Sequence, residues 1–178
     1  KPGHGQIIAA AATILAAIAG IPASLKLLFS HTTTTYILEW SLPFGPCELV
    51  IDPLSAFFLL PVFLVSAAGS FFAVGYWPAA EHRSTECGLT FFYGLLASSM
   101  AILLTVRNGV FFIMVWEVMA LSAYFLLVTE HEREDVRRAG IVYLIATHAG
   151  TAALFVCFSL LAAATGSFML PAAGSLSA

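Results

Sequence analysis

The residue best suited to chemistry is Glu117, in the middle of a twenty-residue stretch, Gly109 to Val128, that holds no other charge. A helix rises about 1.5 Å per residue, so this stretch can cross a bilayer. A charged side chain at its centre costs about 2.5–3.5 kcal/mol. Burial favours the neutral acid, which brings proton uptake and release toward neutral pH. We interpret Glu117 as a candidate proton-handling group; the alternative is a permanently protonated glutamate bonded to a neighbouring helix.

Two further side chains are candidates for a proton path that includes Glu117. His148 also lies near the middle of an apolar stretch, and a neutral imidazole can donate from one nitrogen and accept at the other. A core histidine bonded to a carbonyl or to Thr147 or Thr151 explains this residue equally well. Tyr124 follows Glu117 on the same helical face, where its hydroxyl would extend a hydrogen-bonded chain. The distance between Glu117 and His148 cannot be obtained from sequence.

The composition is typical of an integral membrane protein. Of the 178 residues, 60% are hydrophobic and 10% charged, whereas soluble domains contain about 25% charged residues. No Lys/Arg cluster resembles a phosphate-binding surface, so nucleic acid is not expected as a partner. Cys47, Cys87 and Cys157 form no CxxC pair, so no metal site, iron–sulfur cluster or other cofactor is expected in this chain.

Five apolar stretches predict five transmembrane helices in one all-α domain over residues 1–178. The stretches are residues 7–29, 54–77, 87–106, 109–128 and 136–165. A cleaved signal peptide is the alternative for the first, but its apolar character continues to Phe29, which favours a span.

Residues 32–52 are the one segment with strand character. Residues 32–38 and 47–51 are rich in β-formers, and the Pro and Gly residues between them favour a turn, so we expect an external β-hairpin. Asp52 is expected to cap the following helix, with Pro53 at its first position.

Charge predicts the orientation of the five spans. The N-terminus, the 78–86 loop and the 130–138 loop share one side. That side carries Lys1, Arg83, Arg133, Arg137 and Arg138, against Lys26 and Arg107 on the other. The positive-inside rule places it in the cytoplasm.

Two connections in this topology carry further predictions. The 130–138 loop is interpreted as a solvated turn, with docking of partner subunits as the alternative. The link at 107–109 is expected to be a tight turn in which Asn108 and Gly109 adopt positive φ.

Three segments carry a resemblance to a known family. WEVMALSAYFLL at 116–127 resembles the glutamate-bearing span of the antiporter-like subunits of complex I, Mrp-type cation antiporters and energy-converting hydrogenases. IDPLSAFFLL at 51–60 and RAGIVYLIATHAGTA at 138–152 look like the family's neighbouring segments. The amino-acid sequences of these three segments are most similar to the large membrane subunit of formate hydrogenlyase and hydrogenase-4 complexes. The resemblance runs across nearly the whole chain.

The resemblance implies a proton-translocating role for Glu117, in a helix bundle of which this chain resembles only the N-terminal part. It implies a subunit that is not itself catalytic, in a redox complex of a prokaryotic inner membrane. The partners would be other membrane and soluble subunits that hold nickel–iron and iron–sulfur centres. Family members pair the glutamate with a lysine on a later broken helix, and that lysine has no counterpart here. Alternatives are a subunit of a sodium/proton antiporter and a non-transporting membrane scaffold.

Overall fold

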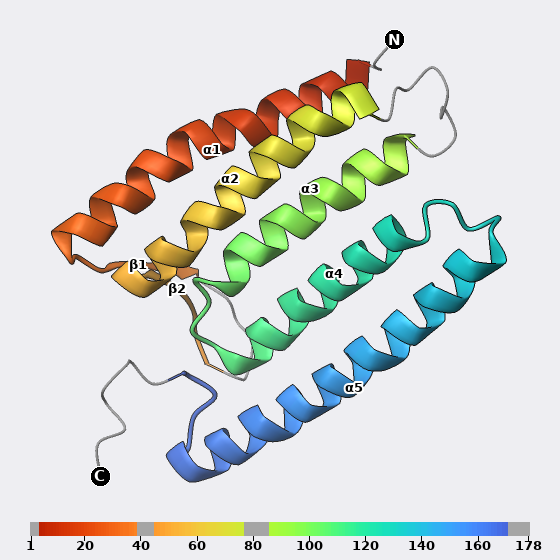
Figure 1. Cartoon of the computed structure of the whole chain (residues 1–178). Coiled ribbons are helices and arrows are strands. Elements are labelled where there is room, and N and C mark those ends of the chain that lie inside the picture. Colours follow the sequence, from red (N-terminus) through yellow and green to blue (C-terminus); the bar gives the residue numbers. More distant parts are fainter. Residues whose placement is uncertain (1–3, 39–44, 77–85, 171–178) are drawn as a thin grey trace.

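The computed structural model describes residues 4–38, 45–76 and 86–170. Over these residues the chain forms five helices and one two-stranded sheet (Figure 1). In chain order the elements are α1 His4–Ser30, β1 Thr34–Leu38, β2 Cys47–Ile51, α2 Pro53–Tyr76, α3 Glu86–Leu103, α4 Gly109–Leu127 and α5 Glu134–Thr165. The predicted all-α bundle with a short hairpin is confirmed.

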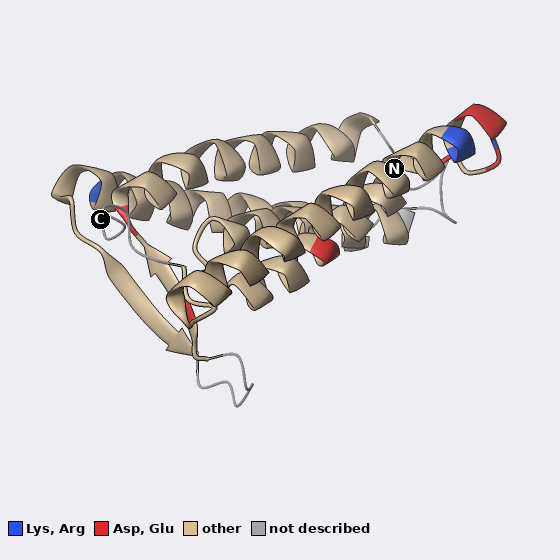
Figure 2. Cartoon of the chain, turned by 90° about the horizontal axis from the view of Figure 1, so that it is seen from below, with Lys and Arg blue, Asp and Glu red and all other residues tan. Residues whose placement is uncertain are grey.

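The helices lie side by side in chain order and run in alternating directions (Figure 1). The start of α1, the end of α2 and the turn between α4 and α5 lie at one end of the bundle. The hairpin, the start of α4 and the end of α5 lie at the other. Figure 2 shows Lys, Arg, Asp and Glu positions toward these two ends of the ribbon, and one acidic position about midway along it. This alternation agrees with the predicted sidedness of the connections, while the cytoplasmic orientation stays a prediction.

Four helices within the described residues are long and apolar enough to cross a membrane: α1, α2, α4 and α5. The remaining predicted span, residues 87–106, is shorter than expected, because α3 ends at Leu103 and its apolar part covers only Cys87–Leu103. Large apolar side chains remain exposed on the bundle, including Phe71 at 76% and Val142 at 67%. Such a surface suits contact with lipid or with further helices.

Polar groups join neighbouring helices at a few points. Gln6 of α1 donates to the carbonyl of Ala73 of α2 at 2.9 Å. Tyr93 of α3 donates to the carbonyl of Ser66 of α2 at 3.0 Å. Because water is absent from the hydrocarbon region, such side chains are stabilised by bonding to an adjacent helix.

The hairpin forms as predicted, with an antiparallel register in which Thr34 pairs with Ile51. Of the Pro and Gly residues predicted to form the turn, Pro43 lies outside the described residues. Asp52 caps α2: its Oδ1 accepts a hydrogen bond from the Ser55 amide at 2.7 Å, and Pro53 is the first helical residue. The capping prediction is therefore confirmed.

The link between α3 and α4 differs from the predicted tight turn. Asn108 has φ −114° and ψ 123°, an extended conformation, and its side chain caps α4 by accepting from the Val110 and Phe111 amides. Positive φ occurs among the described residues at His31, Gly45 and Gly166, so the prediction for Asn108 and Gly109 was wrong.

The link is extended because segments on both sides bond to it. On one side, the Val50 amide donates to the Thr105 carbonyl at 2.7 Å, and the Arg107 amide donates to the Glu48 carbonyl at 2.9 Å. On the other, the Leu170 amide donates to the Arg107 carbonyl at 2.7 Å. The Arg107 side chain also pairs with Asp52. This junction joins the hairpin, the start of α4 and the chain that follows α5.

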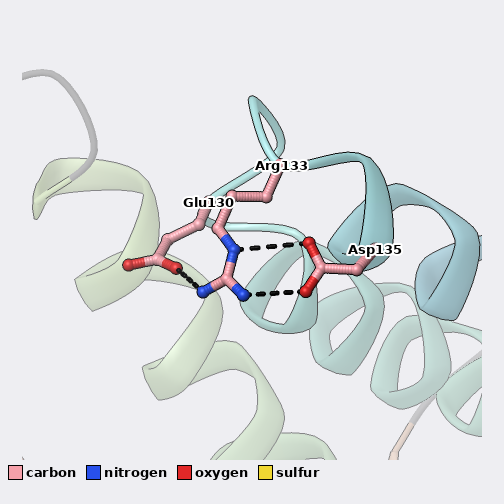
Figure 3. Close-up of polar contacts among 3 residues, drawn as sticks. All are labelled: Glu130, Arg133 and Asp135. Carbon is pink, nitrogen blue, oxygen red and sulfur yellow. Dashed lines mark hydrogen bonds and ion pairs between the residues drawn. The ribbon is translucent and has the colours of Figure 1, made fainter.

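The turn between α4 and α5 is held by its own charges. Arg133 lies between Asp135, at 2.7 Å, and Glu130, at 3.3 Å (Figure 3). These partners raise the pKa of Arg133, and Arg133 lowers the pKa of Asp135. Arg138 pairs with Glu134 at 2.6 Å. The pattern agrees with a solvated turn, where exposed pairs contribute little to stability.

Candidate functional site

Glu117 lies near the middle of α4, and its side chain is half-buried. It retains 29% of its accessible surface within this chain. α4 is apolar along its length apart from Glu117, Ser122 and Tyr124, and the Ser122 hydroxyl donates to the Val118 carbonyl of its own helix at 2.6 Å. Glu117 is therefore the charged group that α4 places at mid-height of the bundle.

The structure brings His148 of α5 to Glu117. The Nε2 atom of His148 lies 3.9 Å from Oε2 of Glu117. Two helices adjacent in the chain thus place both predicted residues opposite each other at mid-height. The sequence suggested each residue, and the antiparallel packing of α4 and α5 makes them neighbours.

The contact made by the other ring nitrogen of His148, Nδ1, indicates which of the two nitrogens carries the hydrogen of the neutral ring. Nδ1 lies 2.9 Å from the Leu144 carbonyl oxygen, one turn earlier in α5. Because a carbonyl can only accept, Nδ1 carries hydrogen in this contact. Nε2, which lies toward Glu117, is then the nitrogen of the neutral ring that carries no hydrogen and can accept a hydrogen bond.

The geometry allows proton exchange after a small side-chain movement. A hydrogen bond between nitrogen and oxygen spans about 2.7–3.2 Å, so the 3.9 Å separation must close by about 1 Å. Contacts of catalytic groups are often long at rest and tighten when they act. His148 keeps 57% of its side-chain surface exposed within this chain, so it has room to turn.

The threonines beside His148 are occupied by their own helix. Thr147 donates to the Tyr143 and Leu144 carbonyls, both at 3.0 Å, and Thr151 donates to the Thr147 carbonyl at 3.1 Å. Such back-bonding satisfies a hydroxyl inside a helix. The alternative role for His148 was a bond to a backbone carbonyl or to one of these threonines. The bond to the Leu144 carbonyl is present, whereas both threonine hydroxyls donate to carbonyls of their own helix.

Tyr124 lies where α4 packs against α5. A Cβ built on Gly140 would stand 3.1 Å from Cε2 of the tyrosine ring. Its ring also contacts Phe125, with ring centroids 5.4 Å apart. Within the part of the chain that the structure describes, its hydroxyl has no hydrogen-bond partner. The predicted role for Tyr124 as a proton-path residue stays a prediction.

Sequence reasoning missed two glycines that lie between α4 and α5. Gly109, the first residue of α4, faces Phe158, and Gly140, near the start of α5, faces Val128 and Tyr124. Neither position uses a positive φ. The signal in the sequence was a glycine at the start of one long apolar stretch and another within the next, which indicates close approach of another segment.

Metal ligands do not gather in the described residues: no three His, Cys, Asp or Glu side chains come together there. Cys47 is buried, and burial raises the pKa of its thiol, while Cys87 and Cys157 are exposed. A half-open apolar cavity of about 590 Å³ lies between α2, α3 and α4, and neither Glu117 nor His148 lines it. Among the described residues, the Glu117–His148 pair on α4 and α5 is therefore the candidate site for proton chemistry.

The chain is similar to three curated proteins. It is 29% identical over 139 residues to hydrogenase-4 component B of Escherichia coli, a match that covers 77% of this chain and 20% of that protein. It is 27% identical over 150 residues to an uncharacterized protein found in two strains of Mycobacterium tuberculosis, covering 84% of this chain and 23% of the relative. No protein-family model matches. The chain thus spans about a fifth of the length of these relatives.

The similarity to hydrogenase-4 component B supports a relation to the antiporter-like membrane subunits. Together with the four membrane-length helices, it indicates a multi-pass membrane protein related to a component of a hydrogenase-type complex.

Proposed function

We propose that this chain is part of a proton-translocating membrane subunit of a redox-driven complex of the energy-converting hydrogenase type. The observation that carries the proposal is the approach of Glu117 to His148 at mid-height of an apolar bundle. Ionisable residues at membrane depth are costly and typically mark ion paths. The similarity to hydrogenase-4 component B supports the same class.

In the proposed step, Glu117 holds a proton as the neutral acid and passes it to Nε2 of His148. Nδ1 keeps its own hydrogen, which stays hydrogen-bonded to the Leu144 carbonyl, so the ring becomes a cation. Glu117, having lost its proton, becomes the carboxylate that faces this cation. Release of the Nε2 proton to the next acceptor returns the histidine to neutrality. Tyr124, further along the same helix, is the candidate for the next hydrogen-bonding group.

The driving force would come from outside this chain. A change of charge in a partner subunit near Glu117 would alter its affinity for a proton, which couples electron transfer to proton movement. Nickel–iron and iron–sulfur centres would belong to those partners. The location would be the inner membrane of a prokaryote, with the N-terminus and the 130–138 loop in the cytoplasm.

Replacing Glu117 tests the proposal. Glu117→Gln keeps the shape of the side chain but removes its titration, and we expect proton movement to fall by about 10²-fold or more. Electron transfer in the partner subunits should stay largely intact. Both rates are measured on the full complex in inverted membrane vesicles. Glu132→Gln, in the exposed turn, is the matched control.

Each alternative has its own outcome in these vesicles. Undiminished proton movement in Glu117→Gln and in His148→Gln would refute the proton-path role and favour a scaffold. Proton movement that requires sodium and proceeds without any electron donor would identify an antiporter subunit instead.

A further inference from the structure

The contacts between α4 and α5 place a glycine on either side of the Glu117–His148 pair. Near the start of α5, a Cβ on Gly140 would lie 2.5 Å from Cγ1 of Val128. At the opposite end of the helix pair, a Cβ on Gly109 would lie 3.1 Å from Cγ of Phe158. Both helices therefore approach as closely as they do because these positions lack a side chain.

An added methyl group at Gly140 cannot be accommodated without movement. Carbon atoms pack at about 3.5–4.0 Å, so a contact at 2.5 Å requires a local separation of about 1.0–1.5 Å. Val128 is β-branched and stiff about its first side-chain torsion, which limits the relief that a rotation can give. The remaining relief is displacement of α5 from α4 at this end.

A displacement of α5 at Gly140 would move His148 by a smaller distance. If the contact at Phe158 acts as a pivot, Gly140 lies about 27 Å from it along α5 and His148 about 15 Å, at 1.5 Å per residue. A movement of 1.0–1.5 Å at Gly140 then becomes about 0.6–0.8 Å at His148. The 3.9 Å separation of Nε2 and Oε2 would lengthen by a comparable amount.

We propose that Gly140 and Gly109 are positioning residues, which set the separation of α4 and α5 and thereby the approach of His148 to Glu117. The inference rests on the proposed function, because it assumes that proton exchange between these two side chains limits proton movement. These two glycines have no side chain and take no direct part in proton transfer, so they would act only through the spacing of the helices.

The test compares alanine at Gly140 with alanine at Gly150. Both glycines lie inside α5, so both substitutions gain similar helix propensity. Nothing lies within 4 Å of a Cβ on Gly150, whereas Gly140 meets Val128. A misplacement of 1 Å can cost about 10²-fold in rate, so Gly140→Ala should slow proton movement per assembled complex by about tenfold or more. Gly150→Ala should leave the rate unchanged.

A second substitution separates spacing from general damage. Val128→Ala removes the Cγ1 atom that the new methyl group meets, so Gly140→Ala/Val128→Ala should recover most of the rate. The solvent deuterium isotope effect should rise in Gly140→Ala, because proton exchange has become slower, and return in the double variant. Loss of folded protein alone would change neither the isotope effect nor the rate per assembled complex.

The outcomes distinguish this inference from the proposed function. If Glu117→Gln stops proton movement while Gly140→Ala matches Gly150→Ala, the positioning role is wrong and the proposed function stands. If Gly140→Ala is slow but Val128→Ala does not restore it, spacing is not the cause and the inference is overturned. If Glu117→Gln and His148→Gln both leave proton movement unchanged, the proposed function itself fails.

Discussion

The junction at Asp52 offers a stability prediction whose size follows from its contacts. Asp52→Ala removes the Oδ1 atom that caps α2 and the carboxylate that pairs with Arg107. Asp52→Asn removes the charge but keeps an oxygen that can accept from the Ser55 amide. The two substitutions therefore separate the cap from the ion pair.

The two contributions have comparable magnitudes. Loss of an N-cap costs about 0.5–2 kcal/mol. The paired side chains are 25% exposed at Arg107 and 23% at Asp52, so the pair falls between exposed pairs, worth about 0–1 kcal/mol, and fully buried ones. We expect Asp52→Asn to lower the free energy of unfolding by about 1–2 kcal/mol and Asp52→Ala by about 2–3 kcal/mol at neutral pH.

The same contacts fix the sign of the pH dependence. Burial by itself raises the pKa of Asp52, but hydrogen bonds from Ser55 and the charge of Arg107 outweigh it, so the pKa lies below its ordinary value. A carboxyl group with a lowered folded-state pKa stabilises the fold fully above its unfolded value of about 3.9. That contribution is lost as pH falls through the folded-state pKa.

Thermal unfolding of the detergent-solubilised protein, followed by circular dichroism, measures these differences. The wild type and Asp52→Asn should differ clearly at pH 7 and converge in strong acid. Asp135→Asn is the control, because Asp135 is 67% exposed in its pair with Arg133 and its loss should cost less than about 1 kcal/mol. Equal stability of the wild type and Asp52→Asn at pH 7, or a gap that persists unchanged in acid, would refute the reasoning.

Two further predictions concern α4. Asn108→Ala removes the cap that accepts from the Val110 and Phe111 amides and should destabilise the protein by about 1 kcal/mol; thermal unfolding indistinguishable from wild type would contradict this. Tyr124→Phe keeps the ring against Gly140 and removes the hydroxyl, so proton flux in vesicles should fall, but less than in Glu117→Gln, with unfolding unchanged. A flux equal to wild type would remove Tyr124 from the proton path.

Local chemistry in the sequence was enough to predict several elements. Asp52 followed by Pro53 predicted a helix start, and the contact with the Ser55 amide confirms it. The β-forming residues on either side of a Pro/Gly-rich segment predicted the hairpin, and the strands pair as expected. These features depend on residues close in sequence, so the types of those residues decide them.

The link at Asn108 shows where local reasoning fails. Asparagine followed by glycine favours positive φ, yet Asn108 is extended. The cause is bonding on both sides, to Glu48 and Val50 of β2 and to Leu170 after α5. These segments lie far from Asn108 in sequence, and their bonds outweigh the local preference.

The sequence alone determined the apolar helices and the depths of Glu117 and His148, since the number of residues from a helix end fixes depth at about 1.5 Å per residue. Only the tertiary structure decided that the two side chains face each other, because depth and helical face do not specify which helix packs alongside or how closely. Gly109 and Gly140 permit that closeness, since an added Cβ would meet Phe158 at the first position and Val128 at the second. The contact of Nδ1 of His148 with the Leu144 carbonyl is local, because that carbonyl lies one turn earlier in the same helix, whereas the approach of Nε2 to Glu117 requires both helices.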